Sequence, residues 1–162
     1  MFTQEGVRKL HHWTHASLTI LLEHLSTLPP ATYAKELHSF GFNTVQKQLV
    51  HIFNCEGFWI SILQEGRHVE REPGEFSAVT DIVGFQQEVR ARTLQYLAVL
   101  TDEQLNGEME IRLPDGDRAV RTPALILHHV LTHAFHHKGQ IVAMCRELGH
   151  PAPDTDLNQV LR

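Results

Sequence analysis

The stretch PALILHHVLTHAFHHKGQIVAMCREL, from Pro123 to Leu148, decides the fold that we expect for this chain. It has the length of a long helix, and its proline stands in the first turn, where a helix tolerates one. Gly149 and Pro151 follow directly, and this combination ends a helix. The apolar residues gather on one side when about 100° of turn is counted per residue. The stretch therefore predicts an amphipathic helix with one buried face.

Three more amphipathic helices are predicted earlier in the chain. They cover about residues 3–28, 43–63 and 79–100. Between the third and the last helix, EMEIRLPDGDRAVRT alternates around Pro114, Asp115 and Gly116, which predicts a short β-hairpin. Four long amphipathic helices predict an all-α four-helix bundle, with the hairpin before the last helix, as a single domain over residues 1–162. Two connections are longer than minimal, so a simple up-down-up-down order is not required.

The composition is that of an ordinary globular protein. The 162 residues are 42% hydrophobic and 20% charged with a formal net charge of −5, which argues against disorder. No basic stripe stands out, so we expect no nucleic-acid partner. The apolar runs fall short of the roughly 20 residues of a membrane span, so we expect no membrane partner either. The chain start shows no secretory signal, and Cys55 and Cys145 stand far apart, which together favour a cytoplasmic protein.

Among the 13 histidines, those of the last predicted helix have a spacing that suits a metal ion. When His133 is set at zero on the inward face, His129 and His137 lie about 40° to either side. Two imidazoles one turn apart can converge on one ion, and both His129/His133 and His133/His137 meet this condition. His129 and His137 are about 12 Å apart along the axis and cannot pair. His128 is expected at the surface and His136 at the edge of the face.

A third ligand has to come from another helix, and His51 is the natural candidate. It stands in the middle of the second predicted helix, on a mostly apolar face. A histidine buried on such a face needs a partner, because an unpaired polar group in the core is costly. A metal ion would satisfy it, and so would a hydrogen bond across the bundle.

Two motifs of this chain resemble the DinB/YfiT-like superfamily of metalloenzymes. They are TVQKQLVHIFNCEGFW, at residues 44–59, and LTHAFHHKGQI, at residues 131–141. HHWTHASLTILLEHL in the first helix and DIVGFQQEVRARTLQYLAVLTDEQL in the third also read like the family, so the likeness covers nearly the whole chain. The most specific piece is the histidine before Lys138-Gly139-Gln140, where the family usually has HRGQ or HKGQ.

The resemblance carries expectations about the site. It implies that His133 and His137 are the ligand pair, with His51 as the third ligand, and that His129 lies in the core or behind a ligand. It also implies a four-helix bundle, often a homodimer, and a divalent metal ion, most commonly zinc or nickel. Characterised relatives include transferases and isomerases that use a low-molecular-weight thiol. A small-molecule substrate is therefore implied, with such a thiol as a candidate partner.

Three neutral imidazoles with an open position form the usual catalytic pattern of zinc. We therefore expect a metal-dependent enzyme of thiol-dependent transferase or hydrolase type, although no residue combination identifies a catalytic nucleophile or base. Ala134 after His133 rules out the HExxH motif of metalloproteases. A single Glu-x-x-His, from Glu147 to His150, falls short of the two that a di-iron site needs. Two alternatives remain: a non-catalytic metal-binding stress-response bundle, and a bundle whose histidines form only hydrogen bonds.

Five residues near the expected site have more than one interpretation. Cys55, one turn from His51 on the second predicted helix, is expected to be a core thiol rather than a fourth ligand. Glu56 falls in an apolar stripe and needs a partner; we favour a pair with a histidine or arginine of another helix over a role at a ligand or a dimer interface. His11 and His15 flank the first helix's apolar stripe, where they either line a pocket mouth or are solvated. Gln140 shares the ligand face and is a candidate hydrogen-bond partner for a ligand or substrate.

Overall fold

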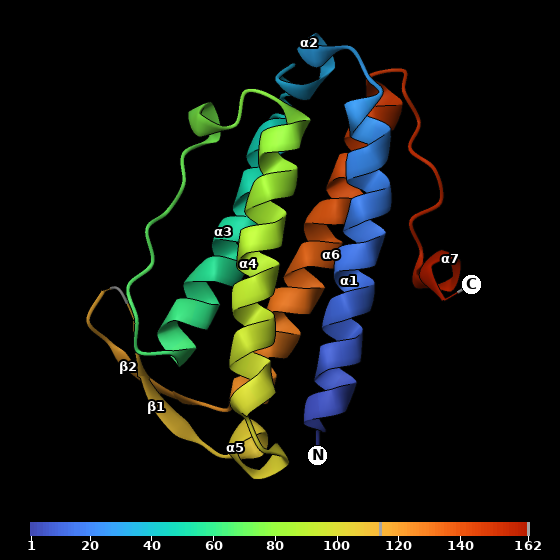
Figure 1. Cartoon of the computed structure of the whole chain (residues 1–162). Helices are drawn as coiled ribbons and strands as arrows, with labels where there is room; N and C mark the ends of the chain where they lie inside the picture. Colours follow the sequence, from blue (N-terminus) through green and yellow to red (C-terminus); the bar gives the residue numbers. More distant parts are fainter. Residues whose placement is uncertain (114, 162) are drawn as a thin grey trace.

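Four long helices form the body of the molecule (Figure 1). In the computed structural model, which describes residues 1–113 and 115–161, they are α1 (Gln4–Ser26), α3 (Val45–Leu63), α4 (Val79–Val99) and α6 (Pro123–Glu147). Their ends lie within two residues of those expected from the sequence. The predicted fold class, an all-α four-helix bundle with a hairpin before the last helix, is confirmed.

Threonines begin three of the four long helices. Thr3, Thr44 and Thr122 each stand at the N-cap, and each side-chain oxygen accepts a hydrogen bond from the backbone N–H three residues further on. This bond satisfies one of the amide groups that a helix start leaves without a partner, and it stabilises a helix by about 1 kcal/mol. The hydrogen bond at Thr44 therefore fixes where α3 starts, and so the position of His51 along the bundle axis.

The helices do not follow the simple up-down-up-down order. α1 and α6 run in one direction and α3 and α4 in the other, because the segment between α3 and α4 returns along the outside of the bundle (Figure 1). α3 packs against both α4 and α6, and α1 packs against the same two helices, so α1 and α3 lie diagonally opposite. This arrangement places the inward face of α6 against the face of α3 that carries His51.

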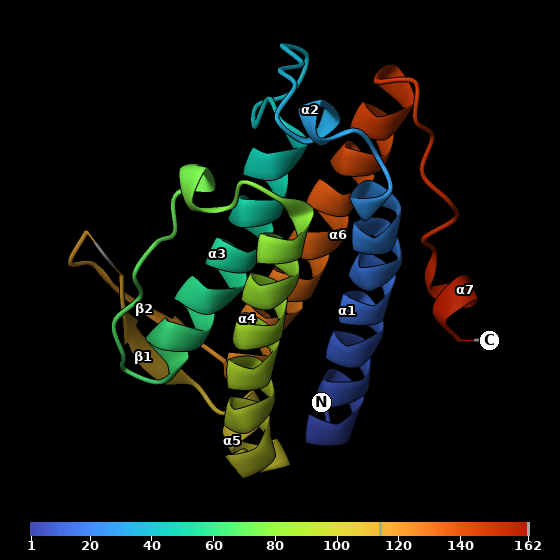
Figure 2. The same ribbon diagram turned by 45° about the horizontal axis from the view of Figure 1, so that its top comes forward.

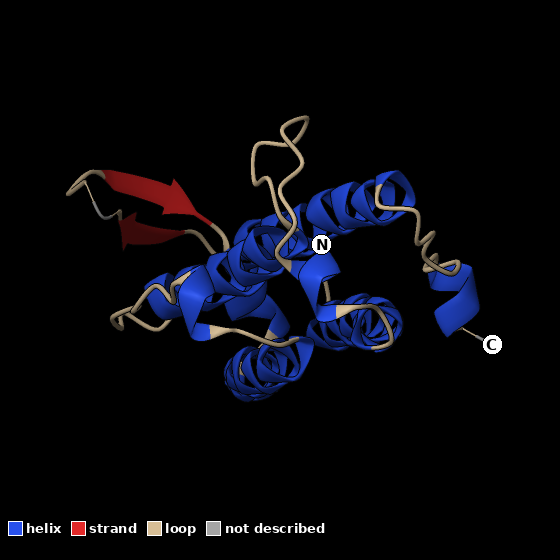
Figure 3. Ribbon diagram, turned by 90° about the horizontal axis from the view of Figure 1, so that it is seen from above, coloured by secondary structure: helices blue, strands red, loops and turns tan. Residues whose placement is uncertain are grey.

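The hairpin consists of β1 (Met109–Arg112) and β2 (Arg118–Arg121), which pair antiparallel and extend to one side of the bundle (Figure 3). Pro114 of the expected turn lies outside the described residues. Gly116 has a φ of +92°, a backbone conformation that favours glycine, and this agrees with its place in the expected turn. Ile111 is buried and anchors the hairpin on the core.

Four short elements were not expected from the sequence. They are α2 (Pro30–Tyr33), the 3-10 helix η1 (Pro73–Glu75), α5 (Asp102–Asn106) and α7 (Leu157–Val160). The chain after α6 turns back and lies beside α1 (Figures 1 and 2). The buried Lys138 ammonium fastens this return, because it donates hydrogen bonds to Ser17 Oγ at 2.9 Å and to the Thr155 carbonyl at 2.6 Å.

The core divides into two apolar clusters, one above the other along the bundle. One contains Leu18 and Phe53, and the other contains Val7, Ile60 and Leu97. Polar residues occupy the level between them on three of the four long helices. No helix of the described chain is long and apolar enough to cross a membrane.

Candidate metal centre

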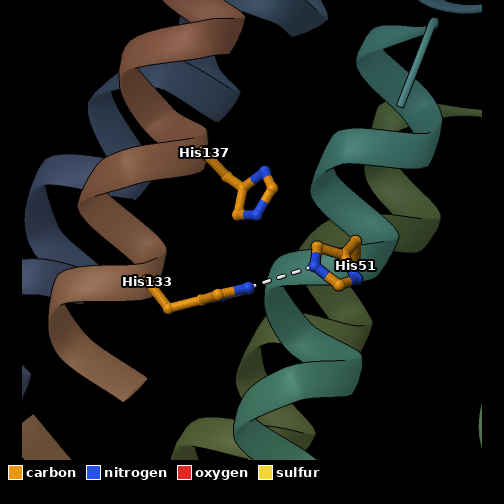
Figure 4. Close-up of side chains that lie close together, drawn as sticks. All are labelled: His51, His133 and His137. Carbon is orange, nitrogen blue, oxygen red and sulfur yellow. Dashed lines mark hydrogen bonds between the residues drawn. The ribbon is translucent and has the colours of Figure 1, made fainter. Parts of the chain in front are cut away.

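Three histidines from two helices meet where α3 packs against α6. His51 comes from α3, and His133 and His137 come from successive turns of α6 (Figure 4). The ligand atoms that these side chains offer all lie within 4.8 Å of one another, and His51 Nε2 lies 3.1 Å from His133 Nε2. The structure thus brings together the three residues selected from the sequence. That they bind a metal remains a prediction.

The donor set fits a divalent ion of the zinc or nickel kind. Imidazole nitrogens suit these metals, and zinc binds them at about 2.0–2.1 Å. Tetrahedral ligands at that bond length stand roughly 3.3–3.4 Å from each other. The 3.1 Å between the two Nε2 atoms is therefore a few tenths of an ångström short of this separation, a gap that small side-chain movements would close. His51 and His133 are partly exposed, which leaves the group reachable from solvent.

A chain of two glutamines holds His137 in place. Gln48 Nε2 donates to Gln140 Oε1 at 2.7 Å and to the Phe42 carbonyl at 2.9 Å, so Gln48 Oε1 faces His137 Nδ1, at 2.6 Å. Since an amide oxygen only accepts, the proton of His137 belongs on Nδ1, and the Nε2 lone pair is free. Such a partner behind a ligand fixes both tautomer and ring orientation. Gln140 continues the chain to His136 at 2.7 Å.

The surroundings keep the imidazoles neutral. Burial lowers the pKa of His133 to about 4, and the neighbouring His137 and His51 add to the effect. The pKa of His137 is also lowered to about 4, first by burial and then by His51. Burial lowers the pKa of His51 as well, although Glu70 opposes the shift. Because only a neutral imidazole has a free lone pair, all three rings are ready to coordinate at neutral pH.

The other histidines of α6 lie outside this group. His128 is exposed, as expected, and His136 is exposed too. We expected His129 to lie either in the core or behind a ligand. The first of these is wrong, because its side chain is exposed. Its ring contacts Trp59 edge-on, with a centroid distance of 5.7 Å. Counting turns placed His129 and His137 at equal angles from His133. In the structure the buried side of α6 is shifted toward His137.

Cys55 is partly buried on α3 and is not a member of the histidine group formed by the described residues. Burial, helped by the charge of Glu56, raises the pKa of its thiol to about 12. Its sulfur is not among the donor atoms that converge with the three histidines. The structure therefore favours the interpretation of Cys55 as a core thiol.

A second polar group lies on the other side of α3. His11 Nε2 donates to one carboxylate oxygen of Glu56 at 2.8 Å, and His15 Nε2 donates to the other at 3.0 Å. The expected pair between Glu56 and a histidine of another helix is confirmed. The prediction that His11 and His15 line a pocket mouth or are solvated is wrong, since they are 1% and 2% exposed. They flank the apolar stripe, but α1 is covered on both flanks by α4 and α6.

A groove of about 950 Å³ lies between the C-terminal end of α3 and the hairpin. Phe58 and Ile62, which share the His51 face of α3, line it together with arginine and glutamate side chains. The three histidines do not line the groove themselves. Glu70 does, and it is close enough to His51 to act on its pKa.

Gln48 and Phe42 are parts of the site that sequence reasoning missed. The Phe42 ring stacks on His51 with a centroid distance of 4.1 Å. Gln48 stands three residues before His51 on the same helix face, and a buried amide there was a signal that could have been read. Phe42 lies in a connection without periodicity, so no pattern pointed to it.

Fold and site together define a class: a helical bundle in which histidines of two neighbouring helices form a group that could hold a metal ion. The chain belongs to the DinB family, whose family model matches residues 1–162. It is 25% identical over 154 residues to Protein DinB of Bacillus subtilis (strain 168), covering 91% of this chain and 89% of the relative. It is also 25% identical over 108 residues to the Uncharacterized protein YizA of the same organism, covering 67% of each.

A solved structure supports the fold. The crystal structure of a DinB-like protein from Bacillus cereus ATCC 10987 superposes with a TM-score of 0.71, at 20% sequence identity, and the match covers 95% of this chain and 99% of that one. The resemblance read from the two sequence motifs is thereby confirmed at the level of family and fold.

Proposed function

We propose that this protein is a metal-dependent enzyme that binds one zinc or nickel ion through His51, His133 and His137 and acts on a small molecule. The reaction that we favour is transfer of a low-molecular-weight thiol to an electrophile, with hydrolysis as the second candidate. The observation that carries the proposal is the convergence of three ligand atoms, within 4.8 Å, from α3 and α6.

The type of ligand favours catalysis over a purely structural ion. Structural zinc sites are usually closed by four protein ligands, whereas catalytic sites have three and an open position. Here the group consists of three imidazoles, and two of them are partly exposed. When bound, a divalent ion with three neutral ligands supplies its full charge as a Lewis acid, which favours a bound thiol in its thiolate form.

The chain's own residues would orient and shelter the reactants. Gln48 fixes the ring of His137, so the direction of that ligand's lone pair does not depend on the substrate. Phe42 stacks on His51 and shields one side of the group from water. The neighbouring groove carries both arginines and glutamates, among them Arg67, Arg112 and Glu70. Such mixed charge suits a zwitterionic small molecule, the usual character of a peptide-like thiol.

Elemental analysis of untagged protein tests the metal. We expect His133→Ala to lose one equivalent of divalent ion relative to the wild type, because two ligands cannot hold the ion. His129→Ala, one turn earlier on α6 and exposed, is the matched control and should keep it. An unchanged metal content in His133→Ala would rule out this site.

An activity assay tests the chemistry. The protein is offered a panel of low-molecular-weight thiols with an electrophilic acceptor, and thiol consumption is followed with and without a chelator. We expect consumption that stops on chelation and returns with zinc or nickel. Metal binding without turnover of thiols or hydrolysable esters would favour the non-catalytic metal-binding bundle instead.

A further inference from the structure

We propose that His11, His15 and Glu56 form a second metal site, closed to solvent, at the centre of the bundle. It takes one zinc-like divalent ion and is independent of the group at His51. The three side chains are 1%, 2% and 3% exposed, and their ligand atoms lie within 4.8 Å of one another.

The position of this group is unusual for polar residues. It lies at the level where the two apolar clusters of the core meet, with Val7 and Ile60 on one side and Leu18 and Phe53 on the other. His11 and His15 reach it from α1, and Glu56 reaches it from the diagonally opposite α3. An ion here would join two helices that have few other direct contacts.

The donor atoms already face one another. His11 and His15 are one turn apart on α1, so their rings stand side by side with a centroid distance of 4.4 Å. Their Nε2 atoms approach the two oxygens of Glu56 at 2.8 and 3.0 Å. Two nitrogens and a bidentate carboxylate supply four donor atoms, the number of a closed zinc site. Ligand atoms of different residues around a tetrahedral ion stand roughly 3.3–3.4 Å apart, so each imidazole would move away from the carboxylate by a few tenths of an ångström.

Charge favours a cation at this place. Thr93 Oγ1 donates to the same carboxyl group at 2.6 Å, so Glu56 faces two imidazoles and one hydroxyl. Within the described residues, no lysine or arginine nitrogen lies within 4.0 Å of it. The countercharge of this buried carboxylate depends on protonated histidines, and a bound divalent ion would supply a charge that does not depend on their protonation.

The types of donor atom point to zinc. The ion would be held by the two Nε2 atoms and the carboxylate, while the two Nδ1 atoms, which are buried without a hydrogen-bond partner within the described structure, would take no part in binding. Two imidazoles and a carboxylate suit zinc, whereas calcium and magnesium require six or more mostly oxygen ligands.

The two sites would differ in role. The group at His51 has only neutral ligands and is partly exposed, while this one includes a carboxylate and is enclosed by three helices. An ion here has no open position for a substrate. It would act as a cross-link in the middle of the bundle.

The test uses the full chain with the first site removed. In the His133→Ala/His137→Ala variant, refolded with zinc, competition with a chromophoric chelator should show one tightly bound equivalent. Adding Glu56→Gln, which keeps the side-chain size, should reduce this to below about a tenth of an equivalent while the helical circular dichroism stays. Gln87→Ala, an exposed residue of α4, is the matched control and should retain the ion.

Crystallography gives a second measurement that does not depend on the Glu56 variant folding. Crystals of the His133→Ala/His137→Ala protein grown with zinc should show an anomalous peak between His11, His15 and Glu56. A protein that binds no zinc in the competition, and a map with no peak there, would overturn the proposal and leave this group as a hydrogen-bonded cluster. Neither result depends on whether the His51 site binds metal or is catalytic.

Discussion

At the scale of single residues, Gln48 is the side chain behind the ligands whose role is most sharply defined. Its amide oxygen Oε1 accepts a hydrogen bond from the Nδ1–H group of His137, with 2.6 Å between oxygen and nitrogen. Partners of this kind typically contribute a factor of 10–100 to metal affinity. We expect Gln48→Ala to weaken zinc binding at the His51 group about 10- to 100-fold, measured by chelator competition. Gln87→Ala should leave it unchanged. Equal affinity in Gln48→Ala and wild type would show that packing alone orients His137.

Glu56 gives a prediction about stability that needs no metal. Its pKa lies well below the usual range: burial acts to raise it, but the charges of His15 and His11 and their hydrogen bonds outweigh that effect. Because the folded pKa lies below the unfolded value of about 4.3, the carboxylate contributes stability above that pH, and the contribution is lost as the pH falls further.

We therefore expect Glu56→Gln to destabilise the chelator-treated protein by about 1.5–3 kcal/mol at pH 7, the range for hydrogen bonds to a charged group. Urea unfolding at several pH values measures this, and the difference from wild type should shrink below pH 4. A difference that stays constant down to pH 3 would contradict the charged state of Glu56.

These residues also show how far the sequence could lead. The candidate pairs on α6 were accessible because i, i+4 spacing and a helix face are local properties, and the resemblance to the family then selected His133 and His137. The burial of His11 and His15 could not be predicted from the sequence, because it depends on α4 and α6 covering both flanks of α1. A helix stripe shows which face is buried but not how wide the buried sector is. The same limit explains the error at His129.

At the scale of elements, the contact between α3 and α6 makes the metal-free protein sensitive to acid. His133 and His137 have folded pKa values of about 4, against about 6.5 when unfolded. Between these values the unfolded chain binds more protons, so stability decreases as the pH falls. The histidines acting on His133 are His137, His51, His129 and His136, all of which oppose its protonation.

We expect the Tm of metal-free wild type to fall between pH 7 and pH 5, and to fall less in His133→Ala/His137→Ala. Calorimetry in the presence of a chelator measures both. The exposed pair His38→Ala/His128→Ala controls for loss of histidines in general and should behave like wild type. Equal pH dependence in all three proteins would show that burial of the two ligands does not govern it.

At the scale of the whole molecule, the sequence predicted the four helices and the hairpin but not their order in space. Caps such as Thr44 and the glycine and proline after α6 are local, and they place the helix ends within two residues. The long return of the chain between α3 and α4 carries no pattern that gives its direction. α3 and α4 pack against each other through contacts such as Phe53 with Phe85 at 5.9 Å, which connect residues distant in the chain.

Removal of metal tests this architecture as a unit, since the His51 group joins α3 to α6 and the proposed second group joins α1 to α3. A ligand at 1,000 times its Kd stabilises a protein by about 4 kcal/mol, and 1 kcal/mol corresponds to about 2–4 °C in a chain of this size. We expect a chelator to lower the Tm by roughly 8–16 °C for each ion removed, in one transition that zinc reverses, because all four helices share the core. With the first site deleted, chelation should still lower the Tm of His133→Ala/His137→Ala, by less than in wild type, because only the enclosed ion is left to remove. A wild-type Tm that does not respond to chelation would mean that neither group holds a metal ion in the folded protein.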